Sequence, residues 1–115
     1  MITLDLLRTL PVSAASGLIA HQGWLYVVAD DDHHLSVLSV NDPAFHHTVR
    51  LFDGELPDDK KERKKHKPDL EALALLPAGE RYPHGALLAI GSGSKANRQR
   101  AVVIPLNAEG LPTAV

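Results

Sequence analysis

Apolar and polar positions in this chain follow one order twice. A short apolar segment, a turn, a longer apolar segment, a polar turn and a third apolar segment fill the first half, and the same order returns in the second half. The matched segments are 16–20 with 71–75, 25–31 with 87–93, and 35–40 with 101–106. Short apolar runs bounded by turn residues are typical of strands that are covered on both faces. The pattern therefore predicts an all-β fold.

Repeats of roughly 40–55 residues that each contain several strands are typical of β-propeller blades, because one blade cannot bury both of its faces alone. We expect about two four-stranded antiparallel blades within a single domain over 1–115. Blade one spans about 13–53, a polar insertion spans 54–67, and blade two spans about 68–115. The last residues, 111–115, resemble the start of a fourth strand that is not completed.

Two segments could contradict this fold. Segment 57–67 places its acids first and its bases last and has no apolar stripe, which predicts one short, solvated helix or a loop. Segment 69–77 contains good helix formers, but it is bracketed by Pro68 and Pro77, and its match to the first repeat favours a strand. The alternative is a small α+β domain that uses this segment as its one core helix.

Composition excludes several classes of protein. The 115 residues are 44% apolar, carry a net charge of −2 and include no cysteine, so disulfides and thiolate metal sites are excluded. No run approaches the roughly 18 apolar residues of a membrane helix. The lysines of 57–67 are diluted by acids and have no aromatic neighbour for base stacking, so we expect no nucleic-acid or membrane partner. Asp5 and Arg8 interrupt the apolar run that a secretory signal requires, which makes the cytoplasm the default location.

Polar residues gather before the first strand and after the second strand of each repeat. Because equivalent loops of neighbouring blades face a common centre, these residues are the candidate ligand-binding site at one end of a channel. The candidate residues are Asp30, Asp31, Lys67, Asp69, Glu71, Ser92, Ser94 and Arg98.

Asp69 and Glu71 are two residues apart, so on a strand both side chains would share one face. Two carboxylates on one face repel each other unless a cation or a proton lies between them, which makes them candidate ligands for calcium or magnesium. Lys67 lies on the same side by parity and could neutralise them instead. A salt bridge at the entry to the strand is thus an equal alternative.

Two other clusters are explained as turns. The run 30–34, three Asp and two His, lacks spaced metal-ligand geometry and favours a hairpin turn. The run 91–94, Gly-Ser-Gly-Ser, resembles a phosphate-cradling turn with the cations Lys95 and Arg98 nearby, and a flexible turn is the alternative. It has neither P-loop spacing nor the spacing of a serine nucleophile elbow.

Residues 67–74, Lys-Pro-Asp-Leu-Glu-Ala-Leu-Ala, followed by His-Gly-Ala-Leu-Leu-Ala-Ile-Gly-Ser-Gly-Ser at 84–94, resemble bacterial phytase-like or esterase-like β-propellers, including propeller families of unknown function. Those families carry an Asp-x-Glu-Gly-Leu-Ala strand, and Ala72 stands here where glycine is expected. The resemblance covers most of the chain and implies a propeller fold with a cation-dependent channel site. It does not carry over phytase activity, because a multi-cation phosphate site needs more ligands than these loops supply.

No acid–base pair or activated nucleophile is identifiable from spacing. We therefore expect a propeller-type binding module of uncharacterised ligand, and the alternative is a cation-dependent hydrolase of phosphate or carboxylate esters. Two blades do not close a ring, and strand 24–29 is apolar on both sides. The expected partner is therefore a second copy of the chain in a homo-oligomer, or the rest of a longer chain of which this is a fragment.

Overall fold

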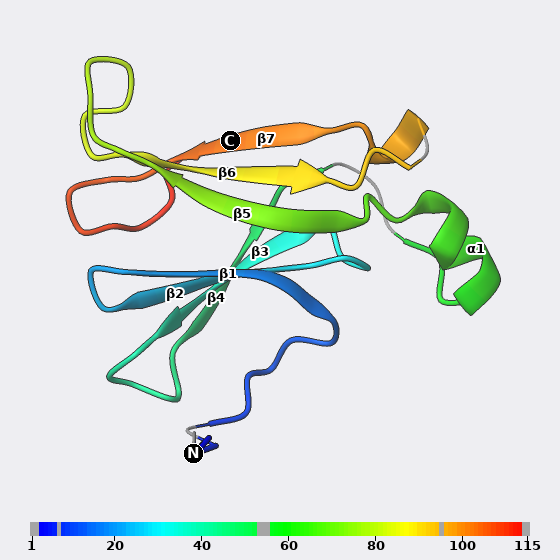
Figure 1. The fold of residues 1–115 in the computed structure, drawn as a ribbon, viewed down its shortest axis with the longest axis horizontal. Helices are drawn as coiled ribbons and strands as arrows, with labels where there is room; N and C mark the ends of the chain where they lie inside the picture. The colour runs from blue at the N-terminus through cyan, green and yellow to red at the C-terminus, as the bar shows by residue number, and fades with distance from the viewer. Residues whose placement is uncertain (1–2, 7, 53–55, 95, 114–115) are drawn as a thin grey trace.

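The structure is a computed structural model that describes residues 3–6, 8–52, 56–94 and 96–113. It is mostly β, with two antiparallel sheets and one short helix, as the sequence predicts (Figure 1). The elements are β1 (Ala15–His21), β2 (Trp24–Ala29), β3 (His34–Ser39), β4 (His46–Arg50), α1 (Lys60–His66), β5 (Leu70–Leu76), β6 (Ala86–Gly91), the 3₁₀ turn η1 (Ala96–Arg98) and β7 (Ala101–Pro105). The predicted core helix of the α+β alternative is instead strand β5.

Each sheet is a simple meander. The first, here called sheet A, has the order β1-β2-β3-β4, and the second, sheet B, has the order β5-β6-β7. Sheet B therefore has three strands among the described residues, where four were expected. The C-terminal segment contributes one isolated bridge between Leu106 and Pro112. Pro105 and Pro112 lack the backbone N–H that a continued ladder needs, and residues 114–115 lie outside the described residues.

The two sheets begin with the same irregularity. The register of each first strand shifts at one extra residue, Ser16 in β1 and Glu71 in β5, so each strand contains a β-bulge at the matched position of the repeat. Two residues later, Leu18 and Leu73 pair with matched positions of β2 and β6. The duplicated sequence pattern therefore corresponds to a duplicated hydrogen-bond register.

One core lies between the two sheets. Tyr26 and Val28 of β2 belong to the same buried cluster as Leu73 of β5 and Leu87 of β6. The backbones approach closely where β1 meets β5, because a Cβ atom on Gly17 would lie 3.1 Å from the Leu73 Cβ. Sheet B lies above sheet A in Figure 1, so the two repeats stack face to face over a shared apolar layer.

The outer faces of the sheets differ in how they are covered. Residues 8–14 cross part of the outer face of sheet A, where the Arg8 guanidinium donates to the Ser39 carbonyl at 2.7 Å. Among the described residues, the outer face of sheet B carries three cross-strand rows of apolar residues, with the exposed Glu71 of the bulge beside the first row. These rows are Ala72, Ile90 and Ala101; Ala74, Leu88 and Val103; and Leu76, Ala86 and Pro105.

Helix α1 and η1 lie at one end of the sheet pair, and the 77–85 and 107–111 loops lie at the other (Figure 1). No residue of α1 is buried, in agreement with the predicted solvated helix. Within the part of the chain that the structure describes, no helix is long and apolar enough to cross a membrane.

The 107–111 loop ties sheet B to sheet A. The Trp24 indole donates to the Glu109 carbonyl at 2.7 Å, and the buried Tyr26 hydroxyl donates to the Gly110 carbonyl. Burial raises the pKa of the Tyr26 phenol from 10.0 to about 12, because the ionised form is poorly solvated there. The phenol is therefore a neutral hydrogen-bond donor at neutral pH.

We expect Tyr26→Phe to lower the free energy of unfolding by about 1–2 kcal/mol, because the buried Gly110 carbonyl loses its donor. Tyr82→Phe, at a half-buried tyrosine outside the core, is the control and should have little effect. The stability contributed by the protonated Tyr26 phenol is present in full below pH 10.0 and is lost as the pH rises through about 12. Urea unfolding at neutral pH and above pH 10 measures both effects, and an unchanged neutral-pH midpoint in Tyr26→Phe would contradict the assigned bond.

Candidate functional site

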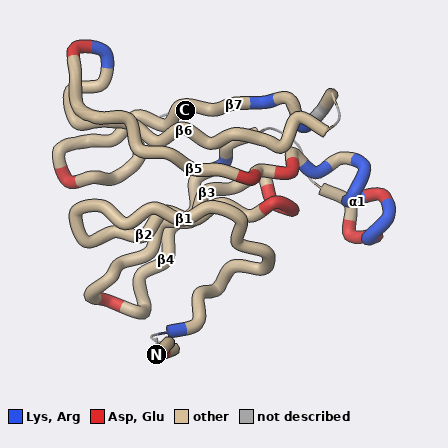
Figure 2. Tube along the Cα trace, in the orientation of Figure 1, with Lys and Arg blue, Asp and Glu red and all other residues tan. Residues whose placement is uncertain are grey.

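Three chain segments meet at the α1 end of the sheet pair. The amide of Asp69, just before β5, donates to the carbonyl of Asp30 at the end of β2, at 3.1 Å. The Asp69 carbonyl in turn accepts from the Ser92 amide, after β6, at 2.9 Å. Figure 2 shows the acidic residues of the β2–β3 turn and of the start of β5 at this end, close to the basic helix α1. Backbone hydrogen bonds thus fix the frame on which the polar side chains stand.

Asp69 is the centre of an ionic cluster. Its backbone adopts a left-handed conformation (φ 53°), which aspartate tolerates better than most residues, and strand β5 begins only at the next residue. Its carboxylate lies 3.7 Å from the Lys67 ammonium and 3.3 Å from the Arg98 guanidinium. Lys67 also reaches the Asp30 carboxylate at 3.4 Å. The cluster therefore alternates negative and positive groups.

The pKa of Asp69 lies below its ordinary value of 3.8. The largest cause is a hydrogen bond from the Ser92 side chain, which outweighs the opposing effect of burial, and the charges of Arg98 and Lys67 add to it. The Asp69 side chain is only 13% exposed, so its charge is partly removed from water and is compensated by these neighbours. Asp69 is an ionised, well-satisfied carboxylate at neutral pH.

Arg98 joins η1 to both the cluster and the helix. Its side chain is 9% exposed and donates to the Asp69 carboxylate, to the Ser94 hydroxyl at 3.1 Å and to the Lys64 carbonyl at 2.6 Å. Its Nε has no hydrogen-bond partner among the described residues. Gly91 lets the backbone of Arg98 lie close to β6, because a Cβ atom at residue 91 would lie 2.4 Å from the Arg98 carbonyl oxygen.

The structure brings together six of the eight candidate residues: Asp30, Lys67, Asp69, Ser92, Ser94 and Arg98. Asp31 lies beside them and accepts a hydrogen bond from Ser13 at 3.0 Å. Glu71 is different, because it is the exposed bulge residue of β5 and makes no hydrogen bond or ion pair with the described residues. Asp69 precedes the strand and Glu71 sits on its bulge, so the parity on which we paired the two carboxylates does not apply.

The other histidine and glycine clusters behave as turns. The Asp32 carboxylate accepts from the His34 amide at 3.2 Å and lies 2.8 Å from His34 Nδ1, which caps the β2–β3 turn. Ser92 and Ser94 hydroxyls lie 3.0 Å apart, so the serines of the 91–94 turn bond to each other and to the ionic cluster. No group of three or more potential metal-ligating side chains occurs among the described residues.

Sequence reasoning missed a basic pocket of about 180 Å³ beside the ionic cluster. It is lined by Asp31, Lys60, Arg63, Lys64 and Lys67. The Arg63 guanidinium donates to the Asp31 carbonyl at 2.6 and 3.1 Å, which anchors α1 to the β2–β3 turn. A signal was present in the sequence, since the four cations recur at i, i+3, i+4 and i+7 and so share one helical face.

Asp69→Asn is expected to lower the free energy of unfolding by about 1–3 kcal/mol, because it leaves Arg98 and Lys67 without their shared counter-charge. A carboxylate whose folded pKa is depressed stabilises the fold above its unfolded pKa, near 3.8, and loses that contribution as the pH falls through the folded value. Stability of the wild type should therefore fall more steeply below pH 4 than that of Asp69→Asn. The measurement is the melting temperature of both proteins as a function of pH, with Asp58→Asn, at an exposed position, as the control. Equal slopes below pH 4 for the wild type and Asp69→Asn would contradict the stabilising role of the Asp69 carboxylate.

Comparison with known proteins gives a family and no function. No curated protein matches the chain, and no solved structure matches it, so the resemblance to phytase-like and esterase-like propellers gains no support from either comparison. A family model described as a family of unknown function, DUF6929, matches residues 11–115, which include both sheets and the whole ionic cluster. The chain therefore belongs to this family of unknown function, DUF6929.

Proposed function

We propose that this chain is a non-catalytic binding module that takes a small anion, such as a phosphate or carboxylate group, at the basic pocket beside α1. The observation that carries the proposal is the balance of charge in that pocket. Four cationic side chains line it against one carboxylate, Asp31. Within the described residues, Lys60 and Lys64 have no carboxylate partner, and both are exposed to solvent. An anionic ligand would supply the missing charge.

The size of the pocket favours a small ligand. Its volume of about 180 Å³ is below the range of about 300–1,000 Å³ that holds a drug-sized molecule. A nucleic-acid strand is disfavoured because α1 offers no aromatic side chain on which a base could stack. Arg63, held by the Asp31 carbonyl, and Lys67, held by Asp30 and Asp69, give the pocket a fixed frame. The exposed Lys60 and Lys64 then serve as adjustable contacts.

The ionic cluster has a supporting role in this proposal. Asp69 and Arg98 neutralise each other, and Arg98 also holds the Lys64 carbonyl at 2.6 Å, which fixes the end of α1 against the sheets. The candidate residues Asp30, Asp69, Ser92, Ser94 and Arg98 then position the pocket, while Lys67 belongs to both groups. Loops held by rigid sheets are a common place for such sites.

Titration with inorganic phosphate and pyrophosphate, followed by calorimetry at low ionic strength, tests the proposal. We expect the double variant Lys60→Gln/Lys64→Gln to bind pyrophosphate about tenfold more weakly, a loss of about 1.4 kcal/mol. Glutamine has a helix propensity close to that of lysine, so the helix itself should persist.

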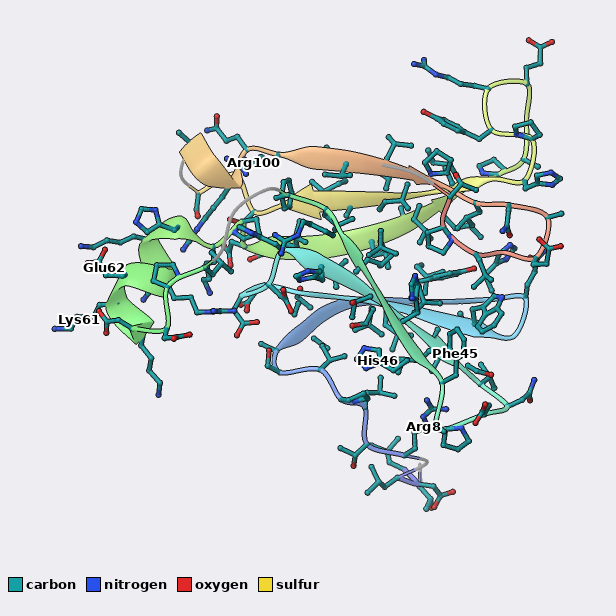
Figure 3. All side chains as sticks on the ribbon, turned by 180° about the vertical axis from the view of Figure 1, so that it is seen from behind. Arg8, Phe45, His46, Lys61, Glu62 and Arg100 are labelled. Carbon is teal, nitrogen blue, oxygen red and sulfur yellow. The ribbon has the colours of Figure 1, made fainter. Side chains whose placement is uncertain are left out.

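The matched control is Lys61→Gln/Lys65→Gln, which removes the same charge from α1 at positions outside the pocket. Lys61 projects away from the body of the protein (Figure 3) and Lys65 pairs with Glu62 at 3.2 Å. Equal losses in the two double variants would show that only net charge matters, and absence of binding by the wild type would also refute the proposal.

The cation-dependent hydrolase is the second prediction of the sequence, and the same protein can test it. Calcium or magnesium bound by Asp69 and Glu71 would raise the melting temperature, and Glu71→Gln would remove that shift. The anion proposal instead expects indifference to both cations, because the Asp69 carboxylate is already paired with Lys67 and Arg98.

A further inference from the structure

Among the described residues, no second sheet covers the outer face of sheet B, although Ala86 at one end of this face is fully buried. Within the described part of the chain, the nine side chains in its cross-strand rows are all apolar, and the exposed Glu71 of the β5 bulge lies beside Ala72 at one end of these rows. Ile90 is 39% exposed, and Ala72, Ala74 and Ala101 are exposed as well. A contiguous apolar sheet face of this kind marks an interaction surface, because its hydration is unfavourable. Four of the nine residues are alanine, which keeps much of the face flat and suits another sheet better than a helix ridge.

The repeat shows what fits on this face. Matching the two sheets by their shared register and bulge places Tyr26 and Val28 of β2 in the positions of Leu88 and Ile90 of β6. Tyr26 and Val28 belong to the face of sheet A that is buried against sheet B. The free face of sheet B is therefore the repeat equivalent of a face that already packs on a sheet within this chain.

The complementary surface also exists in the chain. The same matching places Leu18 and Leu25 of sheet A in the positions of Leu73 and Leu87 of sheet B. Leu73 and Leu87 lie on the face of sheet B that packs against sheet A. Residues 8–14 cover part of this outer face of sheet A, but Leu18 and Val40 remain 50% exposed.

An apolar pocket lies beside Val40 on the outer face of sheet A. It has a volume of about 510 Å³ and is lined by Arg8, Leu10, Leu25, Val40 and Pro43. The charged group among these lining residues, the Arg8 guanidinium, already donates a hydrogen bond to the Ser39 carbonyl. The exposed Ile90 of sheet B is the repeat equivalent of Val28, which packs beside Gly17 and Leu73 in the core.

We propose that a second copy of this chain docks head to tail, with the outer face of its sheet A on the outer face of sheet B. This contact repeats between two chains the packing of sheet A on sheet B that exists within one chain. Both outer faces then bury their apolar side chains as the two inner faces do in the core. Such a contact is heterologous, because the two surfaces differ, and it generates a ring if the rotation closes.

Two variants that each block one surface test the proposal. The wild type should have a mass above that of a single 12.4 kDa chain in size-exclusion chromatography with light scattering. Leu18→Glu blocks one surface and Ile90→Glu blocks the other, so each alone should be monomeric. Their equimolar mixture retains one intact pair of surfaces and should form a dimer that contains one chain of each variant, which isotope labelling and native mass spectrometry identify.

Ala108→Glu, an exposed loop position outside both surfaces, is the control and should leave the assembly intact. A cooperative thermal transition establishes that each variant is folded, and Ala72→Glu replaces Ile90→Glu if the latter is not. A wild type that stays monomeric at every concentration would overturn the proposal. So would an assembly that survives Leu18→Glu, since the face of sheet B would then be pairing with itself.

Discussion

The packing of sheet A on sheet B is the interaction on which the rest of this structure depends. Each sheet is a short meander whose central strand, β2 or β6, is apolar on both faces, so neither sheet is expected to be stable in water alone. Stacking the two buries Tyr26, Val28, Leu73 and Leu87 in one layer, and the close approach at Gly17 lets the first strands of the two repeats meet. The polar ends of the strands are then brought together at the margin of this layer.

The position of the ionic cluster follows from that stacking. Asp30 follows β2 of sheet A, whereas Asp69 and Ser92 flank strands of sheet B, so the hydrogen bond from Asp69 to Asp30 crosses from one repeat to the other. Arg98 extends the connection to α1 through the Lys64 carbonyl. The basic pocket is therefore held by contacts to both sheets, although the helix that supplies most of its cations has no buried residue of its own.

Much of the fold could be predicted from the sequence, because repeat matching outweighed local propensity. Segment 69–77 has the composition of a helix, yet it pairs as β5, since its neighbours in the second repeat need a first strand to complete the sheet. The second sheet has three strands among the described residues, and its C-terminal segment adds one bridge at Pro112, where the sequence predicts the start of a fourth strand that is not completed. Pro105 and Pro112 limit pairing there to one bridge at Leu106.

The site was predicted less completely, for reasons of backbone geometry. The expectation that Asp69 and Glu71 share one face assumed a regular strand, but Asp69 has a positive φ and Glu71 occupies a bulge. A single residue of irregularity reverses which face a side chain occupies. Segment 57–67 was considered for apolar packing and for nucleic-acid binding, and neither role reveals the basic face of α1. Arg63 attaches this helix through the backbone carbonyl of Asp31.

We expect the two sheets to unfold as one cooperative unit. Native-state hydrogen exchange tests it most directly, because the central strands β2 and β6 lie in different repeats and both contribute to the shared core. If the sheets open together, the slowest amides of β2 and β6 exchange with the same free energy of opening and the same denaturant dependence. Exchange of β6 through a separate, lower-energy opening while β2 stays protected would contradict it.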